Sequence, residues 1–219
     1  MSDSPFVALL PKRCSVKQAD EPQWWSGGLY AEERWHAQKM HALRRREFTA
    51  GRNCARAALR SLGLPDVAIG KGAQGEPLFP CAVTGSITHT GDYCAAAVCR
   101  KPGVSSIGID AQQNVDLDQS LYRRVLGHRP GTTIASDGHC EGTLVFSLKE
   151  AFYKALYPVC QRPVPAMALK VHLPASFGPC IIEVLTPALK TVVEAFNVDI
   201  RFSFDEQRIY SAVTLSERS

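Results

Sequence analysis

Two carboxylates and two lysines in the second half of the chain have types and spacing suited to chemistry. Asp110 ends an apolar, strand-like segment, where an acid buried without a partner is costly. Glu150 and Lys154 lie one helical turn apart in FSLKEAFYKALYP, which also contains Lys149. Two carboxylates, with water and a phosphate oxygen, can hold Mg²⁺ octahedrally. A surface ion pair, which contributes only a few tenths of a kcal/mol, is the alternative for Glu150 and Lys154.

The segment 43–62 combines a helical apolar face with an excess of positive charge. Its apolar positions recur at helical spacing, namely Phe48, Ala55, Leu59 and Leu62. It holds six arginines, Arg44, Arg45, Arg46, Arg52, Arg56 and Arg60. The segment contains one acid, Glu47, so the arginines repel one another unless a polyanionic ligand relieves them. A solvated arginine face is the alternative interpretation.

Two further segments offer groups for a ligand. The glycine-rich sequence GKGAQGEPLFP begins at Gly70, and its backbone N–H groups and Lys71 can approach an anion, although it does not match a P-loop. A short strand is predicted over 86–90, with Ser86 and Thr88 beside His89. His89 is either a hydrogen-bonded core histidine or a ligand-binding group.

The order of predicted elements is a long helix followed by strands, twice over. Helical periodicity covers 31–62 in two pieces and returns at 145–157, where Pro158 is expected to stop the helix. The segment 167–215 reads as four strands. This order predicts an α+β fold of two similar subdomains, 1–104 and 105–219, each a long helix on antiparallel strands and related by a pseudo-two-fold axis.

Composition limits the classes of protein that fit. The chain has 219 residues, of which 45% are apolar, so it can build a sizeable core. Its net charge of +4 suits an anionic ligand or an acidic partner and is too small to indicate nucleic acid by itself. No secretory signal, tight cysteine pairing or membrane-spanning stretch is visible. We therefore expect a cytoplasmic protein whose eight cysteines are reduced and mostly buried.

The sequence GID at 108–110, followed by FSLKEAFYKA at 146–155, resembles the signature of the 4′-phosphopantetheinyl transferases. That signature joins a Gly-hydrophobic-Asp strand end to a helix of the pattern [Phe/Trp]-[Ser/Cys/Thr]-x-Lys-Glu-[Ala/Ser]-x-x-Lys. All positions of the helix pattern are met, by Phe146, Ser147, Lys149, Glu150, Ala151 and Lys154. The upstream sequences RRREFTAGRNCARAAL, KGAQGEP and GSITHTGDY are similar to the monomeric, two-halved branch of the family. The resemblance covers roughly residues 40–158.

The resemblance implies an enzyme that binds coenzyme A and Mg²⁺ in a cleft between its two halves. Such an enzyme moves the 4′-phosphopantetheine arm to a serine of an apo acyl or peptidyl carrier protein and releases adenosine 3′,5′-bisphosphate. Asp110 and Glu150 would be metal ligands, and Glu150 or a metal-bound water would be the base. Lys154 would balance the pyrophosphate charge and protonate the leaving group. The implied coenzyme-binding residues are Arg44, Arg52, Lys71, Ser86, Thr88, His89, Asp110, Lys149 and Lys154.

The chain departs from the family pattern at one position. The commonest pattern is Gly-x-Asp-x-Glu, and this chain has Gln112 in place of the glutamate. We expect Gln112 to contact the metal weakly or through water, which bears on the preference for Mg²⁺ or Mn²⁺. The carrier docking surface is predicted near 115–142, with Tyr122, Arg123 and Arg124.

Two other classes of protein are compatible with parts of the sequence. A non-catalytic module that binds a nucleotide or a carrier would keep the arginines and need no metal. A metal-dependent phosphodiesterase would release the nucleotide without an acceptor. The arginine helix lacks the interleaved aromatic residues of RNA-binding surfaces, so we expect no nucleic-acid partner.

Overall fold

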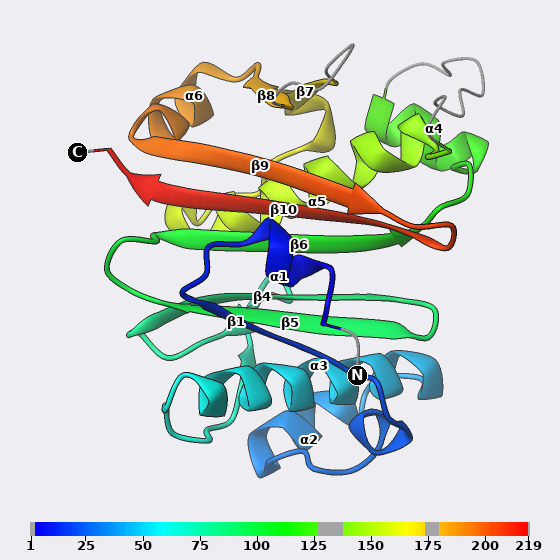
Figure 1. Ribbon diagram of the computed structural model, residues 1–219, viewed down its shortest axis with the longest axis vertical. Coiled ribbons are helices and arrows are strands. Elements are labelled where there is room, and N and C mark those ends of the chain that lie inside the picture. Colours follow the sequence, from blue (N-terminus) through cyan, green and yellow to red (C-terminus); the bar gives the residue numbers. More distant parts are fainter. Residues whose placement is uncertain (1–2, 127–137, 174–179, 219) are drawn as a thin grey trace.

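The computed structural model describes residues 3–126, 138–173 and 180–218 (Figure 1). The first half contains α1 Phe6–Leu9, β1 Cys14–Gln18, η1 Pro22–Trp25, α2 Ala31–Ala37, α3 Ala42–Ser61, β2 Gly70–Lys71, β3 Pro77–Leu78, β4 Val83–Thr90 and β5 Tyr93–Arg100. The second half contains β6 Ser106–Gln113, α4 Gln119–Leu126, α5 Glu141–Cys160, η2 Ala166–Ala168, β7 Leu169–His172, β8 Ile181–Val184, α6 Pro187–Glu194, β9 Phe196–Phe204 and β10 Arg208–Glu217. No helix in these described ranges is long and apolar enough to cross a lipid bilayer.

The N-terminal lobe is an antiparallel sheet of order β1-β5-β4 with α3 packed on one face (Figure 1). Strand β5 is the central strand of this sheet and is almost entirely buried. Because most of its residues are small, α3 can lie close to it. The helix contributes Ala55, Ala58 and Leu59, each fully buried, to the core beneath it. The two-residue strands β2 and β3 form a hairpin beside this lobe.

The C-terminal lobe is an antiparallel sheet of order β6-β10-β9, covered by α5 (Figure 1). Leu144, Leu148, Phe152 and Ala155 of α5 recur at helical spacing and are at most 1% exposed. The predicted apolar stripe is therefore confirmed, except that Leu144 takes the place expected for Val145. The α+β prediction with antiparallel strands is also confirmed, whereas the pseudo-two-fold relation and the boundary at 104/105 stay predictions.

Two local expectations for this lobe were wrong. Helix α5 continues past Pro158 to Cys160, and Gln161 caps it with a left-handed φ of 51°. A proline in the last turn removes only one backbone hydrogen bond, and its φ is already helical. The helix therefore does not end at the proline itself. Helix α6 occupies part of the segment that was predicted as strands only. Its signals are Thr186 at the N-cap and Pro187 at the first helical position.

The two sheets meet where β4 and β6 run side by side. The hydroxyl of Ser86 accepts a hydrogen bond from the backbone N–H of Ile109 at 3.0 Å. The hydroxyl of Thr88 accepts one from the N–H of Ala111 at 2.9 Å. Both pairs advance in the same direction along the chain, so the strands run parallel, and the side chains satisfy amides of β6 that face the other lobe.

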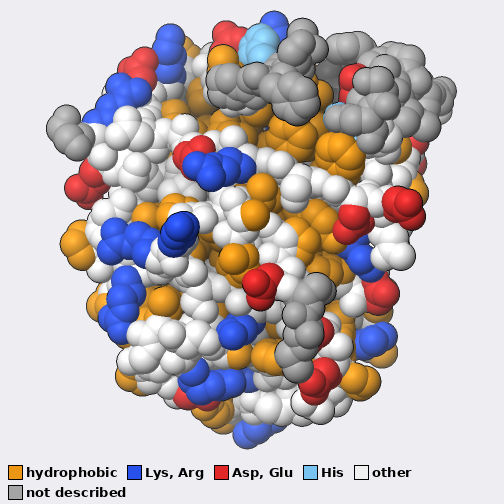
Figure 2. Space-filling view, viewed as in Figure 1, with side chains coloured by type: hydrophobic (Ala, Val, Ile, Leu, Met, Phe, Trp, Pro, Cys, Tyr) orange, Lys and Arg blue, Asp and Glu red, His pale blue; other side chains and the backbone are white. Residues whose placement is uncertain are grey.

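The N-terminal segment covers this junction from one side. Phe6 and Leu9 of α1 pack in a core that also contains Ala97 of β5, Ile109 of β6 and Tyr210 of β10. This face mixes basic, acidic and apolar side chains, and among the described side chains no continuous basic stripe crosses it (Figure 2). The lobes are thus joined by one apolar core and one strand junction, and the opposite side of the junction is open to the cavity described next.

Candidate functional site

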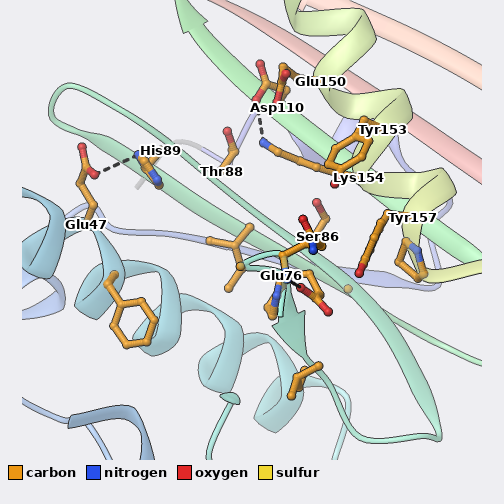
Figure 3. Close-up of a pocket in the computed structure, with 18 of the residues that line it drawn as sticks. Glu47, Glu76, Ser86, Thr88, His89, Asp110, Glu150, Tyr153, Lys154 and Tyr157 are labelled. Atoms are coloured by element: carbon orange, nitrogen blue, oxygen red, sulfur yellow. Dashed lines mark hydrogen bonds and ion pairs between the residues drawn. The ribbon is translucent and has the colours of Figure 1, made fainter. Parts of the chain in front are cut away.

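A cavity of about 490 Å³ lies between the lobes (Figure 3). Its walls come from α3, the β2–β3 hairpin and β4 of the N-terminal lobe, and from β6 and α5 of the C-terminal lobe. The predicted site residues that line it are Arg44, Arg52, Ser86, Thr88, His89, Asp110, Gln112, Glu150 and Lys154. Sequence segments more than a hundred residues apart therefore supply one site.

Close packing of β6 on α5 places the acidic wall. Gly108 is two residues before Asp110 and faces the same side of the strand. A Cβ atom at Gly108 would lie 1.9 Å from the backbone oxygen of Ala151, so only glycine permits this approach. The strand consequently delivers Asp110 directly to the turn of α5 that carries Glu150 and Lys154.

Asp110 is 3% exposed, and both of its carboxylate oxygens accept hydrogen bonds. Lys154 Nζ donates to Oδ1 at 2.7 Å and also to the backbone oxygen of Ile109 at 3.1 Å. Gln112 Nε2 donates to Oδ2 at 2.8 Å. The buried acid is therefore paired and hydrogen-bonded, which is the condition under which burial of a charge is tolerated.

Glu150 lies beside Asp110, with the two carboxylates next to each other at one end of the cavity (Figure 3). Burial raises the pKa of Glu150, the nearby Lys154 lowers it, and the neighbouring charge of Asp110 raises it again. A carboxylate with a raised pKa is a better proton acceptor than a solvated one.

The acidic wall has the donor chemistry of a sparse site for a hard divalent cation. Across the residues that the structure describes, no group of three or more His, Cys, Asp or Glu side chains could hold a metal. Asp110 and Glu150 supply two carboxylates, and the amide oxygen of Gln112 supplies a neutral third donor. Mg²⁺ usually takes one or two carboxylates from a protein and keeps several waters, so this set fits it.

On the opposite wall, Arg44 and His89 both contact one acid, Glu47. Arg44 lies in the first turn of α3 and donates to Glu47 Oε2 at 3.3 Å. Its guanidinium also contacts Nε2 of His89. His89 Nδ1 lies 3.4 Å from the same Glu47 oxygen (Figure 3). An arginine can only donate, so His89 Nε2 accepts from Arg44 and Nδ1 carries the proton toward Glu47.

His89 is held neutral in this arrangement. Burial and the adjacent Arg44 lower its pKa to about 4, against an opposing effect of Glu47. A histidine that accepts from the arginine leaves other guanidinium N–H groups available to an anion. Glu47 was not selected from the sequence as a site residue, because an acid between arginines reads equally well as a surface ion pair.

Arg52 acts on the loop before the hairpin as well as on the cavity. Its guanidinium donates to the backbone oxygens of Ile69 and Gly70, each at 2.9 Å, and lies over the ring of Phe48. Burial lowers the pKa of Arg52 to about 10. The residue is 5% exposed, so it fixes the start of the β2–β3 hairpin.

The interpretation of all six arginines as uncompensated was wrong for two of them. Arg56 pairs with the fully buried Glu33 of α2, with Arg56 Nη1 2.6 Å from Oε1. Arg60 pairs with Asp66, with Arg60 Nη1 2.5 Å from Oδ2. Both acids lie outside the helix segment, so a count within that segment cannot include them.

Two predicted coenzyme-binding residues do not line the cavity. Lys149 is 6% exposed, and its ammonium group donates to the backbone oxygens of Val125 at 2.6 Å and Ala166 at 2.9 Å. It therefore ties α4 and η2 to α5. Lys71 is exposed on β2, and other residues of the hairpin line the cavity instead, namely Gln74, Gly75, Glu76, Pro77 and Leu78.

The predicted docking surface is also changed. Tyr122 is 3% exposed and its hydroxyl donates to Asp116 at 2.6 Å, so it is a structural residue. Arg123 and Arg124 are exposed on α4. The part of that surface at 127–137 lies outside the described residues.

The geometry of the cavity is typical of a protein that binds a phosphorylated ligand. An acid pair with a lysine on one wall, opposite an arginine and a histidine on the other, suits a phosphorylated ligand held together with a divalent cation. Ser86 and Thr88 lie between these walls, and their hydroxyls still have a proton to donate.

Comparisons with known proteins agree with this class. Residues 32–99 match the model of the 4′-phosphopantetheinyl transferase N-terminal domain. The chain is 43% identical over 121 residues to the 4′-phosphopantetheinyl transferase Npt of Nocardia iowensis, covering 54% of each chain. It is 36% identical over 162 residues to Svp of Streptomyces mobaraensis, covering 70% of this chain and 65% of that one. It is 40% identical over 126 residues to PptT of Mycobacterium tuberculosis, covering 55% of each.

The resemblance to the 4′-phosphopantetheinyl transferases that was seen in the sequence is confirmed. The matched part spans between 54% and 65% of the length of these relatives. What the whole protein does is therefore argued below from its own site.

Proposed function

We propose that this protein transfers the 4′-phosphopantetheine arm of coenzyme A to a serine of an apo acyl or peptidyl carrier protein. The product besides the modified carrier is adenosine 3′,5′-bisphosphate. One observation carries the proposal, namely that Asp110, Glu150 and Lys154 face Arg44 and His89 across a single cavity. Opposite walls of unlike charge are what a diphosphate and its counter-cation need.

A Mg²⁺ ion fits the acidic wall, with Asp110 and Glu150 as ligands and Gln112 as a weaker or water-mediated third donor. When bound, it would neutralise charge on the diphosphate of the coenzyme. Since Gln112 donates its amide N–H to Asp110, its amide oxygen is the atom left to face a cation or its water. Mn²⁺ takes the same kind of oxygen donors and is expected to substitute.

The cationic wall binds and orients the coenzyme. Arg44 and His89 contact its phosphates, and Arg52 holds the hairpin that closes this part of the cavity. Ser86 and Thr88 donate their remaining hydroxyl protons to phosphate oxygens. Two tyrosines of α5, Tyr153 and Tyr157, also line the cavity (Figure 3).

Glu150 and Lys154, which lie one helical turn apart, move the protons. Glu150 accepts the proton of the carrier serine as its oxygen attacks the phosphorus next to the pantetheine arm. The bond from that phosphorus to the bridging oxygen breaks. Lys154, 2.7 Å from Asp110, turns toward the diphosphate and gives a proton to the departing bisphosphate. Positioning and charge neutralisation do most of the work in such a transfer.

The partners follow from this reaction. Carrier proteins are acidic, and the exposed Arg123 and Arg124 on α4 are the residues that we propose to contact such a partner. We further propose that the protein acts as a monomer in the cytoplasm. The reaction itself sets no choice between acyl and peptidyl carriers.

Transfer of labelled pantetheine tests the proposal directly. Purified protein, Mg²⁺ and coenzyme A labelled in its pantetheine arm are mixed with an apo carrier protein, and label on the carrier is measured. Label is expected on the carrier and is expected to be absent from a carrier whose acceptor serine is changed to alanine. Release of adenosine 3′,5′-bisphosphate without acceptor would indicate a phosphodiesterase instead. Coenzyme binding with no transfer to any member of a carrier panel would indicate a binding module.

A further inference from the structure

Two cysteines from distant parts of the chain face each other on neighbouring strands. Cys14 of β1 is the register partner of Cys99 of β5 in an antiparallel pair. The backbone N–H of Cys14 donates to the backbone oxygen of Pro11 at 2.8 Å and makes no bond across to β5. The N–H of Ala19, five residues on, donates across the ladder to Cys94 at 2.8 Å. Because hydrogen-bonded and non-hydrogen-bonded pairs alternate, Cys14 and Cys99 form a non-hydrogen-bonded pair.

That position suits a disulfide. The Cα atoms of a non-hydrogen-bonded pair lie about 4.5 Å apart, within the range of roughly 4.4–6.8 Å that disulfides span. The two thiols lie close enough for each to shift the pKa of the other. Backbone movement is therefore not required to join them.

The two cysteines of this pair differ in their access to solvent and in their pKa values. Cys14 is partly exposed, whereas Cys99 is fully buried behind it. The neighbouring Cys99 and burial raise the pKa of Cys14, whereas the neighbouring Cys14 lowers the pKa of Cys99 against the effect of burial, and the guanidinium of Arg13 lowers it further. Cys14 is thus the sulfur that an oxidant reaches first, and Cys99, its register partner, is placed to resolve a mixed disulfide formed at Cys14.

We propose that Cys14 and Cys99 form a redox-active dithiol that a small disulfide compound, such as oxidised glutathione, converts to an intrachain disulfide. One cysteine thiolate attacks a sulfur of glutathione disulfide, forming a mixed disulfide and expelling one glutathione thiolate. The second cysteine attacks the protein sulfur of the mixed disulfide and expels the other glutathione. Two electrons pass from the protein to glutathione disulfide, and the two thiol protons end on two glutathione molecules.

The consequence for the fold is a covalent link at an edge. Strand β1 is the outer strand of the N-terminal sheet. Cys14 and Cys99 border the apolar core that α1 shares with both lobes. Oxidation would fasten the N-terminal segment over the junction, and this inference does not depend on the transferase reaction.

The chain offers an internal control for the role of access. Cys54 of α3 lies close enough to Cys94 of β5 for that thiol to raise its pKa. Both are fully buried, so an oxidant in solution does not reach them. A difference between the two pairs therefore shows that neighbouring thiols alone are not sufficient for oxidation.

Mass spectrometry tests the proposal on the full chain. Reduced protein is incubated with oxidised glutathione at neutral pH, free thiols are blocked with iodoacetamide, and the digest is searched for joined peptides. We expect a product about 2 Da lighter before blocking, since two hydrogens are lost, with Cys14 joined to Cys99. Cys54 and Cys94 should react with iodoacetamide only after denaturation.

Two variants complete the test. Cys99→Ser should leave Cys14 as a stable mixed disulfide with glutathione, because the resolving thiol is gone. Cys54→Ser should not change the yield of the Cys14–Cys99 link. The proposal is overturned if the unmodified chain accumulates only glutathione adducts at Cys14. It is also overturned if that chain stays fully reduced while Cys99→Ser forms the adduct. A third contrary result is a Cys54–Cys94 link that forms as fast as the Cys14–Cys99 link. Stable reduction of both the unmodified chain and Cys99→Ser would also overturn it, since Cys14 would then be unreactive.

Discussion

Helices α3 and α5 have the same length of 20 residues, and each packs on a three-stranded antiparallel sheet, yet they bring opposite chemistry to the cavity. Helix α3 presents Arg44 and Arg52, with Glu47 holding Arg44 and His89. Helix α5 presents Glu150 and Lys154 next to Asp110. Under the proposed function, these similar scaffolds would divide the work, since the α3 wall would bind a polyanion and the α5 wall would hold a cation and move protons.

This division makes a general prediction about kinetics. Loss of a group on the α3 wall should weaken coenzyme binding and raise KM. Loss of a group on the α5 wall should lower kcat, because those groups act on the reacting atoms. The following changes are ordered from the largest expected effect to the smallest.

Glu150→Ala should produce the largest loss. It removes a metal ligand and the proton acceptor together, so kcat should fall about 1,000-fold or more. Binding of adenosine 3′,5′-bisphosphate, measured by calorimetry without metal, should stay within a fewfold of the unmodified protein. Glu194→Ala on α6 is the control, because Glu194 is exposed and does not line the cavity. Full activity in Glu150→Ala would remove Glu150 from the site.

Arg44→Ala should affect binding more than rate. Loss of a charge-assisted contact to phosphate should raise KM for coenzyme A about 10- to 100-fold, with a smaller change in kcat. Arg45→Ala is a matched control, since the next residue lines a separate groove with Arg34 and Arg46. Equal effects of the two substitutions in steady-state kinetics would show that general charge, and not the cavity wall, binds the coenzyme.

Gln112→Glu should strengthen the acidic wall. A third carboxylate adds ligand charge, so the Mg²⁺ concentration that gives half-maximal transfer should fall about tenfold. The substitution also removes the N–H that now donates to Asp110, and the two acids would repel each other without a cation. The metal-free protein should therefore melt at a lower temperature and be rescued by Mg²⁺. An unchanged metal requirement would place the cation away from Gln112.

Lys149→Met should act on stability and not on binding, although Lys149 is part of the same helix. Two backbone oxygens would lose their donor, which costs about 1–3 kcal/mol, and Tm should fall about 2–4 °C for each kcal/mol. KM for coenzyme A should change little, because the ammonium group points away from the cavity. Lys170→Met, at an exposed position of β7, is the control and should melt normally. A large rise in KM with unchanged Tm would return Lys149 to the coenzyme site.

Local pattern sufficed for the parts of the site that lie within one element. The helical spacing of Glu150 and Lys154 and the strand-end position of Asp110 follow from periodicity, and the structure brings all three to one cavity. The arginine excess on α3 indicated a ligand-binding face, and the family resemblance singled out Arg44 and Arg52, both of which line the cavity.

Contacts between residues far apart in the sequence could not be predicted from local sequence pattern. Glu33 reaches Arg56 from 23 residues away, and Lys149 finds its two acceptors on α4 and η2. The bonds that Ser86 and Thr88 accept from β6 depend on which strands become neighbours across the lobes. Each of these contacts is a property of the tertiary arrangement, so the residue type alone is compatible with either a ligand or a structural role.

The most direct test of the two-walled site is the position of a bound metal. Crystals grown with coenzyme A and Mn²⁺ allow the ion to be located by its anomalous scattering. The arrangement of charges predicts one strong peak between the carboxylates of Asp110 and Glu150, with the coenzyme diphosphate reaching from it toward Arg44 and His89. A coenzyme bound outside this cavity, or a peak that contacts neither carboxylate, would contradict it.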